Sequence, residues 1–234
     1  MIASRNEGSL NALSGVLFVA LSVTGAVLAG LLAPVPYPYP GAPPAEIVRY
    51  FAEGRAAVLA AGLLQVLAAI SLLAFVVFAR RTVISGAAGV HATVGLSAGA
   101  GVLAASLLFL TAILMLALAL PATAEAPALA GALHYVVFVA GGPAHVASLG
   151  LFVGGVSLAA SRQSTGTLPR WIAWEGIVAA TLSLACLFSF LWFPASVLIP
   201  IGRLLCFVWI VNTSLALARG GRRAEAARVG EVAG

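Results

Sequence analysis

Polar side chains interrupt the long apolar runs of this sequence, one in each of five runs and at a similar depth. They are Thr24, Gln65, Thr111, His145 and Arg203. Arg203 lies about eight residues inside its run, about 12 Å deep at about 1.5 Å per helical residue. A charged side chain at that depth in a membrane costs at least about 2.5–3.5 kcal/mol, so it needs a partner or a purpose.

Two interpretations of this polar level stay open. In the first, the side chains of Gln65, Thr111, His145 and Arg203 line a pocket that opens outward. Arg203 would anchor an anionic or carbonyl-bearing group, and His145 would add a second hydrogen bond. In the second, the same groups hydrogen-bond to one another and only fix the packing of the helices.

A second polar set lies nearer the opposite ends of the runs. Glu175 is one turn into its run, and Asn212 is two turns from the end of the last run. A carboxylate inside a span can carry a proton in a coupled transporter. A glutamate near a helix start also favours the N-terminal dipole and reaches interfacial water. Proton coupling and a purely structural role therefore both remain interpretations of this set.

The sequence does not assemble a familiar catalytic or cofactor site. A haem held by two histidines needs them at one depth, but His91, His134 and His145 fall at three different levels. No group of histidines and carboxylates has the spacing of a metal site. We therefore predict no catalytic residues, no metal and no cofactor, and the sequence favours a protein that is not an enzyme.

The composition requires lipid around these elements. The chain is 62% hydrophobic and only 8% charged, and its mean hydropathy is +1.11. Soluble domains carry about 25% charged residues, so this chain cannot cover a water-facing surface. Its arginines sit at the ends of apolar runs and form no basic face, which excludes nucleic acid as a partner and makes the lipid bilayer the expected one.

Six runs are long enough to cross about 30 Å of hydrocarbon, which takes about 20 helical residues. We therefore predict an all-α polytopic bundle of six helices in one domain, residues 1–218, followed by a flexible basic tail, residues 219–234. The six predicted spans are Leu13–Ala33, Ala56–Ala79, Ala92–Leu120, Ala130–Ala160, Trp171–Phe193 and Ala195–Ala218.

The arginines predict the orientation of the bundle. Nine of them fall on the side that holds both chain ends, and only Arg49 and Arg55 fall on the other. Because positive charge is retained in the cytoplasm, both termini are predicted to be cytoplasmic. The loop that follows the first span is then on the outside.

That outer loop contains the stretch PVPYPYPGAPP, residues 34–44. Pro34 ends the first helix, and Tyr37 and Tyr39 suit the membrane interface. A short surface helix is predicted to start at Pro44, with Ile47 and Phe51 on its apolar side. The stretch is either a rigid connector between two spans or a lid over an external pocket, with a tyrosine pointing inward.

The fourth span is interrupted near its middle. Gly141, Gly142 and Pro143 break a helix that would otherwise be overlong, and His145 lies just beyond them. Broken helices near mid-membrane expose backbone groups to ligands or ions in many transporters. A proline kink whose free backbone groups are satisfied by neighbouring helices is the plainer interpretation.

Two sections of the chain resemble a family of uncharacterised bacterial membrane proteins of the actinobacterial type, a domain of unknown function. The sections are AEIVRYFAEGRAAVLAAGLLQVLAAISLLAFVVFARR and AHVASLGLFVGGVSLAASRQSTGTLPRWIAWEGIVAATLSL, the second with an LPRW turn at residues 168–171. The resemblance implies a multi-pass, six-helix protein of the bacterial inner membrane. It transfers no activity.

These observations lead to two hypotheses about function. In the first, the protein binds or transports a small or amphiphilic molecule, such as a lipid, through the pocket around Arg203. In the second, it is a non-catalytic accessory subunit that packs against a larger membrane complex. Neither the ligand nor the oligomeric state follows from the sequence.

Overall fold

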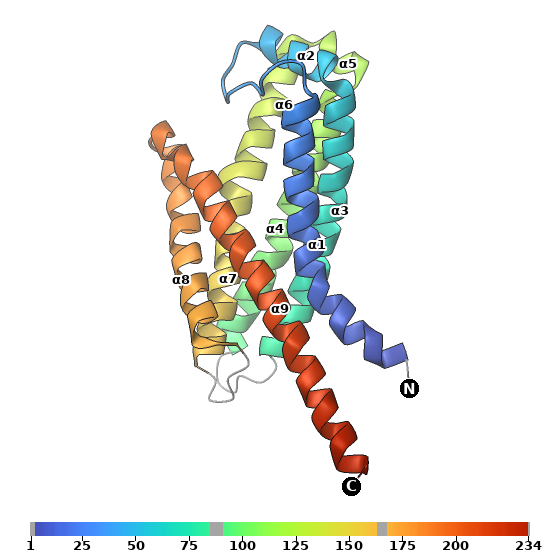
Figure 1. The fold of residues 1–234 in the computed structure, drawn as a ribbon. Helices are drawn as coiled ribbons and strands as arrows, with labels where there is room; N and C mark the ends of the chain where they lie inside the picture. Colours follow the sequence, from blue (N-terminus) through green and yellow to red (C-terminus); the bar gives the residue numbers. More distant parts are fainter. Residues whose placement is uncertain (1–2, 85–90, 163–167, 234) are drawn as a thin grey trace.

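The chain folds into a bundle of long helices that run roughly alongside one another, as the computed structural model in Figure 1 shows. The structure describes residues 3–84, 91–162 and 168–233. Within these ranges, six helical segments are long and apolar enough to cross a membrane. The predicted all-α polytopic bundle is therefore confirmed.

The helices follow the predicted runs closely, because a span needs about 20 apolar residues in unbroken helix. The last helix passes residue 218 without a break and continues to Ala233, so the predicted tail is helical up to that residue. The helices are α1 (Ala3–Leu32), α2 (Pro44–Glu53), α3 (Arg55–Ala79), α4 (His91–Leu118), α5 (Pro121–Ala124), α6 (Pro127–Val139), α7 (His145–Ser161), α8 (Arg170–Ala185) and α9 (Leu198–Ala233).

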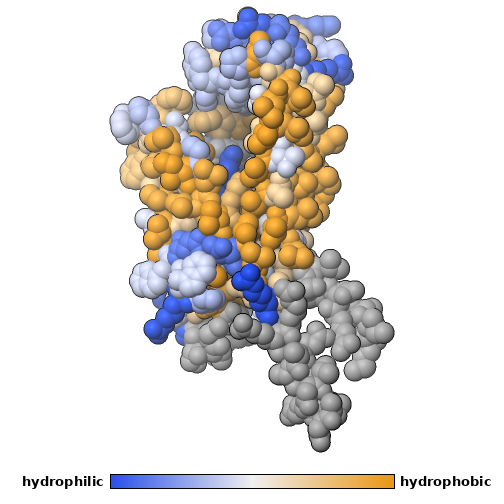
Figure 2. Space-filling view, viewed as in Figure 1, coloured by the Kyte–Doolittle hydropathy of each residue, from blue (hydrophilic) through white to orange (hydrophobic). Residues whose placement is uncertain are grey.

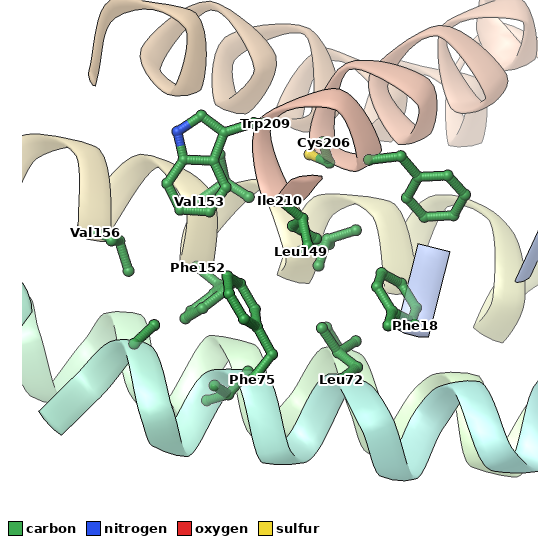
Figure 3. Packing of buried hydrophobic residues seen from close by; sticks show 14 of the residues in the cluster. Phe18, Leu72, Phe75, Leu149, Phe152, Val153, Val156, Cys206, Trp209 and Ile210 are labelled. Carbon is green, nitrogen blue, oxygen red and sulfur yellow. The ribbon is translucent and has the colours of Figure 1, made fainter. Parts of the chain in front are cut away.

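The core of the bundle lies where α3, α4, α7 and α9 meet (Figure 3). Phe152 of α7 lies at the centre of this core. Its ring packs edge-to-face with the rings of Phe75 and Trp209, with centroid distances of 6.0 and 6.3 Å. Trp209 is fully buried and donates its indole N–H to the carbonyl of Ile172 at 3.0 Å. Close packing of this kind holds helices together in lipid, where the hydrophobic effect between them is absent.

A cap of short helices covers the end of the bundle that is predicted to lie outside, called the outer end below, where α2 and α5 lie beside the start of α6 (Figure 1). Proline begins α2 as predicted, and Ile47 and Phe51 are buried together with Tyr50. The predicted surface helix is therefore present, and its buried side packs on the bundle.

The fourth span is kinked and remains nearly continuous. A π-helical segment, Ala140–Ala144, joins α6 to α7, and only Gly142 within it leaves the helical region, with φ −89° and ψ −107°. Cys186 of the neighbouring 3-10 turn donates its thiol to the Pro143 carbonyl at 3.6 Å. This bond ties the kink to a neighbouring segment; because proline removes the donor to the carbonyl one turn before it and not to its own, the plainer interpretation stays a prediction.

Cysteine labelling tests the predicted orientation. Tyr39, 60% exposed, and the exposed Ser161 lie at opposite ends of the bundle. Cys186 and Cys206 are both buried, so they should contribute little background. We expect an impermeant maleimide added to intact cells to label a Tyr39→Cys protein and to label Ser161→Cys only after the membrane is opened. Labelling of both from outside would contradict the six-span topology.

Candidate functional site

A cavity of about 640 Å³ lies in the outer half of the bundle. Its walls come from α1, α3, α4, the kinked α6–α7 span and α9. Figure 2 shows it as a hollow between two apolar walls, with a hydrophilic patch inside. The structure places all four of the predicted pocket residues along this cavity: Gln65, Thr111, His145 and Arg203.

Arg203 reaches the cavity from α9 and is partly buried. Its Nη2 donates a hydrogen bond to the carbonyl of Gly141 at the kink, and its Nε is buried with no partner. Among the residues that the structure describes, Arg203 forms no ion pair with a carboxylate. A guanidinium has five N–H donors, so most of its hydrogen-bonding capacity remains for a bound group.

The kink is what lets the guanidinium reach a backbone carbonyl. In a regular helix the Gly141 carbonyl would accept the N–H of residue 145, four positions on, and the π-helical segment changes this pattern. Gly141 also lies tightly against α4: a Cβ there would be 2.6 Å from Cγ2 of Thr111. Glycine is therefore required for α4 and the kink to approach this closely.

His145 and Thr111 present hydrogen-bond acceptors to the cavity. The Nδ1 of His145 donates to the Ala104 carbonyl at 2.9 Å, because a carbonyl oxygen can only accept. In the neutral ring this leaves Nε2 with the lone pair. The hydroxyl of Thr111 donates to Leu107 of its own helix at 2.8 Å, which leaves the oxygen lone pairs. The cavity therefore combines a cationic donor with neutral acceptors.

The two remaining members of the predicted polar level differ in their positions. Gln65 is half-buried and lines the cavity from α3, so it joins the site. Thr24, which the sequence placed at a similar depth but did not count among the pocket residues, is exposed on the outside of α1 and does not line the cavity. Ser22, two residues earlier in α1, lines the cavity instead. The hydroxyl of Ser22 is buried without a hydrogen-bond partner.

Tyr37 lies over the outer end of the cavity, whereas Tyr39 does not line it. The ring of Tyr37 packs against Tyr50 at 5.2 Å and His134 at 5.3 Å, and its hydroxyl donates to Sδ of Met115 at 3.9 Å. Tyr37 is 49% exposed overall, but the groups packed around its phenol desolvate it and raise its pKa above the ordinary value, and the nearby Tyr50 raises that pKa further. The hydroxyl therefore stays protonated and can act as a donor. An inward-pointing tyrosine is the geometry expected of a lid.

His134 is a feature of this region that the sequence did not single out. It is 1% exposed, and both of its ring nitrogens lack a hydrogen-bond partner. Its ring is surrounded by Tyr37 and by Phe51, whose centroid is 6.2 Å away. The only signal in the sequence was a histidine near the outer end of a span, a position that usually faces interfacial water.

Glu175 and Asn212 are brought together, at a distance from the cavity. The side-chain amide of Asn212 donates to both carboxylate oxygens of Glu175, at 3.2 and 3.1 Å. Neither residue lines the cavity. The pair links α8 to α9, which supports the structural interpretation of this set, and proton coupling stays a prediction.

The part of the chain that the structure describes contains no group of three or more histidine, cysteine, aspartate or glutamate side chains that could hold a metal ion. Comparison with protein-family models, curated proteins and solved structures gives no significant match. The interpretation of the cavity therefore rests on its own residues.

Proposed function

We propose that this multi-pass membrane protein binds a small amphiphilic molecule in the cavity, with the anionic or carbonyl-bearing head of the molecule on Arg203. The observation that carries the proposal is the guanidinium itself, which faces the cavity with one backbone hydrogen bond and, among the described residues, no carboxylate partner. An intramembrane charge is costly, and such residues commonly mark substrate or ion pathways.

The chemistry of the walls supports this class of ligand. A guanidinium binds carboxylate and phosphate groups through two parallel N–H bonds, which are shorter and stronger than neutral ones. The amide of Gln65 can donate to a carbonyl or accept from a hydroxyl near the head, and Nε2 of His145 can accept from a hydroxyl. The rest of the lining is almost entirely apolar, from residues such as Leu21, Leu108 and Phe207, and suits a hydrocarbon portion.

Binding is the first part of this proposal, and passage across the membrane would need a further step. Phe207 lines the inner end of the cavity, and its ring meets Phe18 of α1 at 5.2 Å with the planes at 87°. Transport would require this contact to open. We place the protein in a bacterial inner membrane on the basis of the resemblance of its sequence.

Native mass spectrometry of the protein released from mild detergent tests the proposal. We expect a retained species whose mass and fragmentation identify an amphiphile with a carboxylate or phosphate head. Retention of a second polypeptide, and of no small molecule, would instead favour the accessory-subunit hypothesis.

Tyr37 should control how fast a bound molecule leaves toward the outer water, as measured in detergent with a water-soluble acceptor for the released molecule. A Tyr37→Ala change removes the ring contacts with Tyr50 and His134, each worth about 0.5–1.5 kcal/mol. If the position of Tyr37 over the cavity is less stable by about 1–2 kcal/mol, release should be about 5- to 30-fold faster. We expect this in an exchange experiment with isotopically labelled palmitate, the 16-carbon fatty acid, as the probe.

Tyr39→Ala is the matched control for that experiment, since Tyr39 belongs to the same proline-rich segment and does not line the cavity. It should exchange palmitate at the wild-type rate. Equal rates for all three proteins would mean that the segment is only a connector.

A further inference from the structure

The cavity has a side opening, and its position follows from how α1 and α9 cross. The two helices touch in the inner half of the bundle, where Phe18 meets Phe207 and where a Cβ on Gly15 would lie 2.9 Å from Ile210. Toward the outer side they diverge (Figure 1). The hollow of Figure 2 lies in this same view, between the two diverging helices.

The rim of this opening is apolar and faces the surroundings of the bundle. On α1, Val23 and Val27 line the cavity and are 42% and 50% exposed. On α9, Leu204 lines the cavity and is 58% exposed, and Pro200 beside it is also exposed. All four residues lie within the membrane-spanning segments, so the medium outside this opening is hydrocarbon.

We propose that the ligand is a single-chain amphiphilic anion, of the fatty-acid class, which enters sideways from the outer leaflet between α1 and α9. This inference rests on the proposed function, since it takes Arg203 as the anchor of the head. The head passes the rim and meets the guanidinium, while the tail lies along the cavity and out between Val27 and Leu204.

Charge and accessibility favour a ligand that is already dissolved in the membrane. The uncompensated guanidinium is complementary to an anion. The rim residues named above have no hydrogen-bonding side chain, so a hydrated anion would lose its water at the rim without gaining a replacement. From the outer water, the way in is covered by Tyr37, which is packed on Tyr50 and His134. A freely soluble anion would have to displace that cluster, whereas an amphiphile with its tail in the bilayer would not.

The size of the cavity favours one chain over two. A volume of about 640 Å³ is within the range of about 300–1,000 Å³ that is usual for one drug-sized ligand. A single head with one tail fills such a space, and the open side lets a longer tail extend into the surrounding lipid. The ligand's tail can therefore be longer than the cavity, although the cavity holds only one tail.

Blocking the opening tests the inference. A double variant, Val27→Trp with Leu204→Trp, places an indole on each side of the rim. Its matched control is Thr24→Trp with Val208→Trp: both positions are exposed on the same two helices, and neither lines the cavity. All four positions face lipid, so neither variant is expected to disturb the fold.

The experiment measures uptake of labelled palmitate from phosphatidylcholine nanodiscs, followed over time by native mass spectrometry. We expect the wild type and the control variant to load at the same rate and the rim variant to load about tenfold more slowly or not at all. Inorganic phosphate, as a soluble anion without a tail, should not displace palmitate.

The other outcomes separate this inference from the proposed function. If the rim variant loads as fast as the wild type while Arg203→Leu does not load, the site stands and lateral entry is wrong. If phosphate displaces palmitate in an Arg203-dependent manner, the site accepts soluble anions and the assignment to the fatty-acid class is wrong. If Arg203→Leu loads as well as the wild type, the proposed function fails and this inference fails with it.

Discussion

An Arg203→Leu protein should fold and insert normally but lose the amphiphile that the wild type retains. Each charge-assisted hydrogen bond from the guanidinium is worth about 1.5–3 kcal/mol, so the loss of even one should weaken binding by about tenfold to 150-fold. Folding should survive because removing the charge also removes an insertion cost of about 2.5–3.5 kcal/mol. What folding loses is the hydrogen bond from the guanidinium to the Gly141 carbonyl, worth about 1.5–3 kcal/mol, which is no more than the insertion cost that is removed.

Two further variants make this result specific. Arg203→Lys keeps the charge without the planar fork, so palmitate binding should be intermediate between those of the wild type and the leucine variant. Arg49→Leu removes an exposed arginine on α2, at the outer cap, and should bind as the wild type does. Equal binding by Arg203→Leu and the wild type would remove Arg203 from the site.

The largest effect on stability is expected for Trp209→Ala. Trp209 is fully buried, its ring meets Phe152 at 6.3 Å, and its indole N–H donates to the Ile172 carbonyl at 3.0 Å. Truncation of a buried tryptophan leaves a cavity and costs about 3–5 kcal/mol. The indole packs directly against Gly176, where a Cβ would lie 2.4 Å from the indole nitrogen, so no side chain at position 176 can fill the space that the truncation leaves. Thermal unfolding in one detergent should show a clearly lower Tm.

Trp174→Ala is the matched control for this change. Trp174 lies in α8 and is 67% exposed, so it is surrounded by lipid and contributes little to packing between helices. Its replacement should leave the Tm nearly unchanged. A similar loss in both variants would mean that membrane anchoring by tryptophan, and not the packing at Phe152, determines the stability of the bundle.

The spans could be predicted from the sequence because hydrocarbon thickness imposes a minimum length on each helix. The depth of the polar residues was also predictable, since each helical residue advances about 1.5 Å. For this reason the sequence alone predicts that Gln65, Thr111, His145 and Arg203 lie at one level, and all four line the cavity. The position of the kink was predictable for another reason: Gly141, Gly142 and Pro143 weaken the helix there, and the structure places the non-helical backbone at Gly142.

The rotation of each helix could not be predicted in this way. Several spans are apolar on every side, so the sequence carries no periodic signal for the face that packs inward. The sequence therefore could not show that Thr24 faces lipid while its neighbour Ser22 lines the cavity. Which of Tyr37 and Tyr39 points toward the cavity likewise could not be predicted. It depends on the contacts of Tyr37 with Tyr50 and with His134, and His134 is distant from both tyrosines in the sequence. The side opening follows from a crossing of α1 and α9 that composition does not encode.

A cryo-electron microscopy map of the protein in palmitate-containing phosphatidylcholine nanodiscs, with an antibody fragment to add mass, tests the central claim most directly. We predict an elongated density in the cavity, with one end within hydrogen-bonding distance of the Arg203 guanidinium and the other leaving between α1 and α9. A cavity filled by side chains, or a density that makes no contact with Arg203, would contradict the claim that this arginine holds an anionic amphiphile.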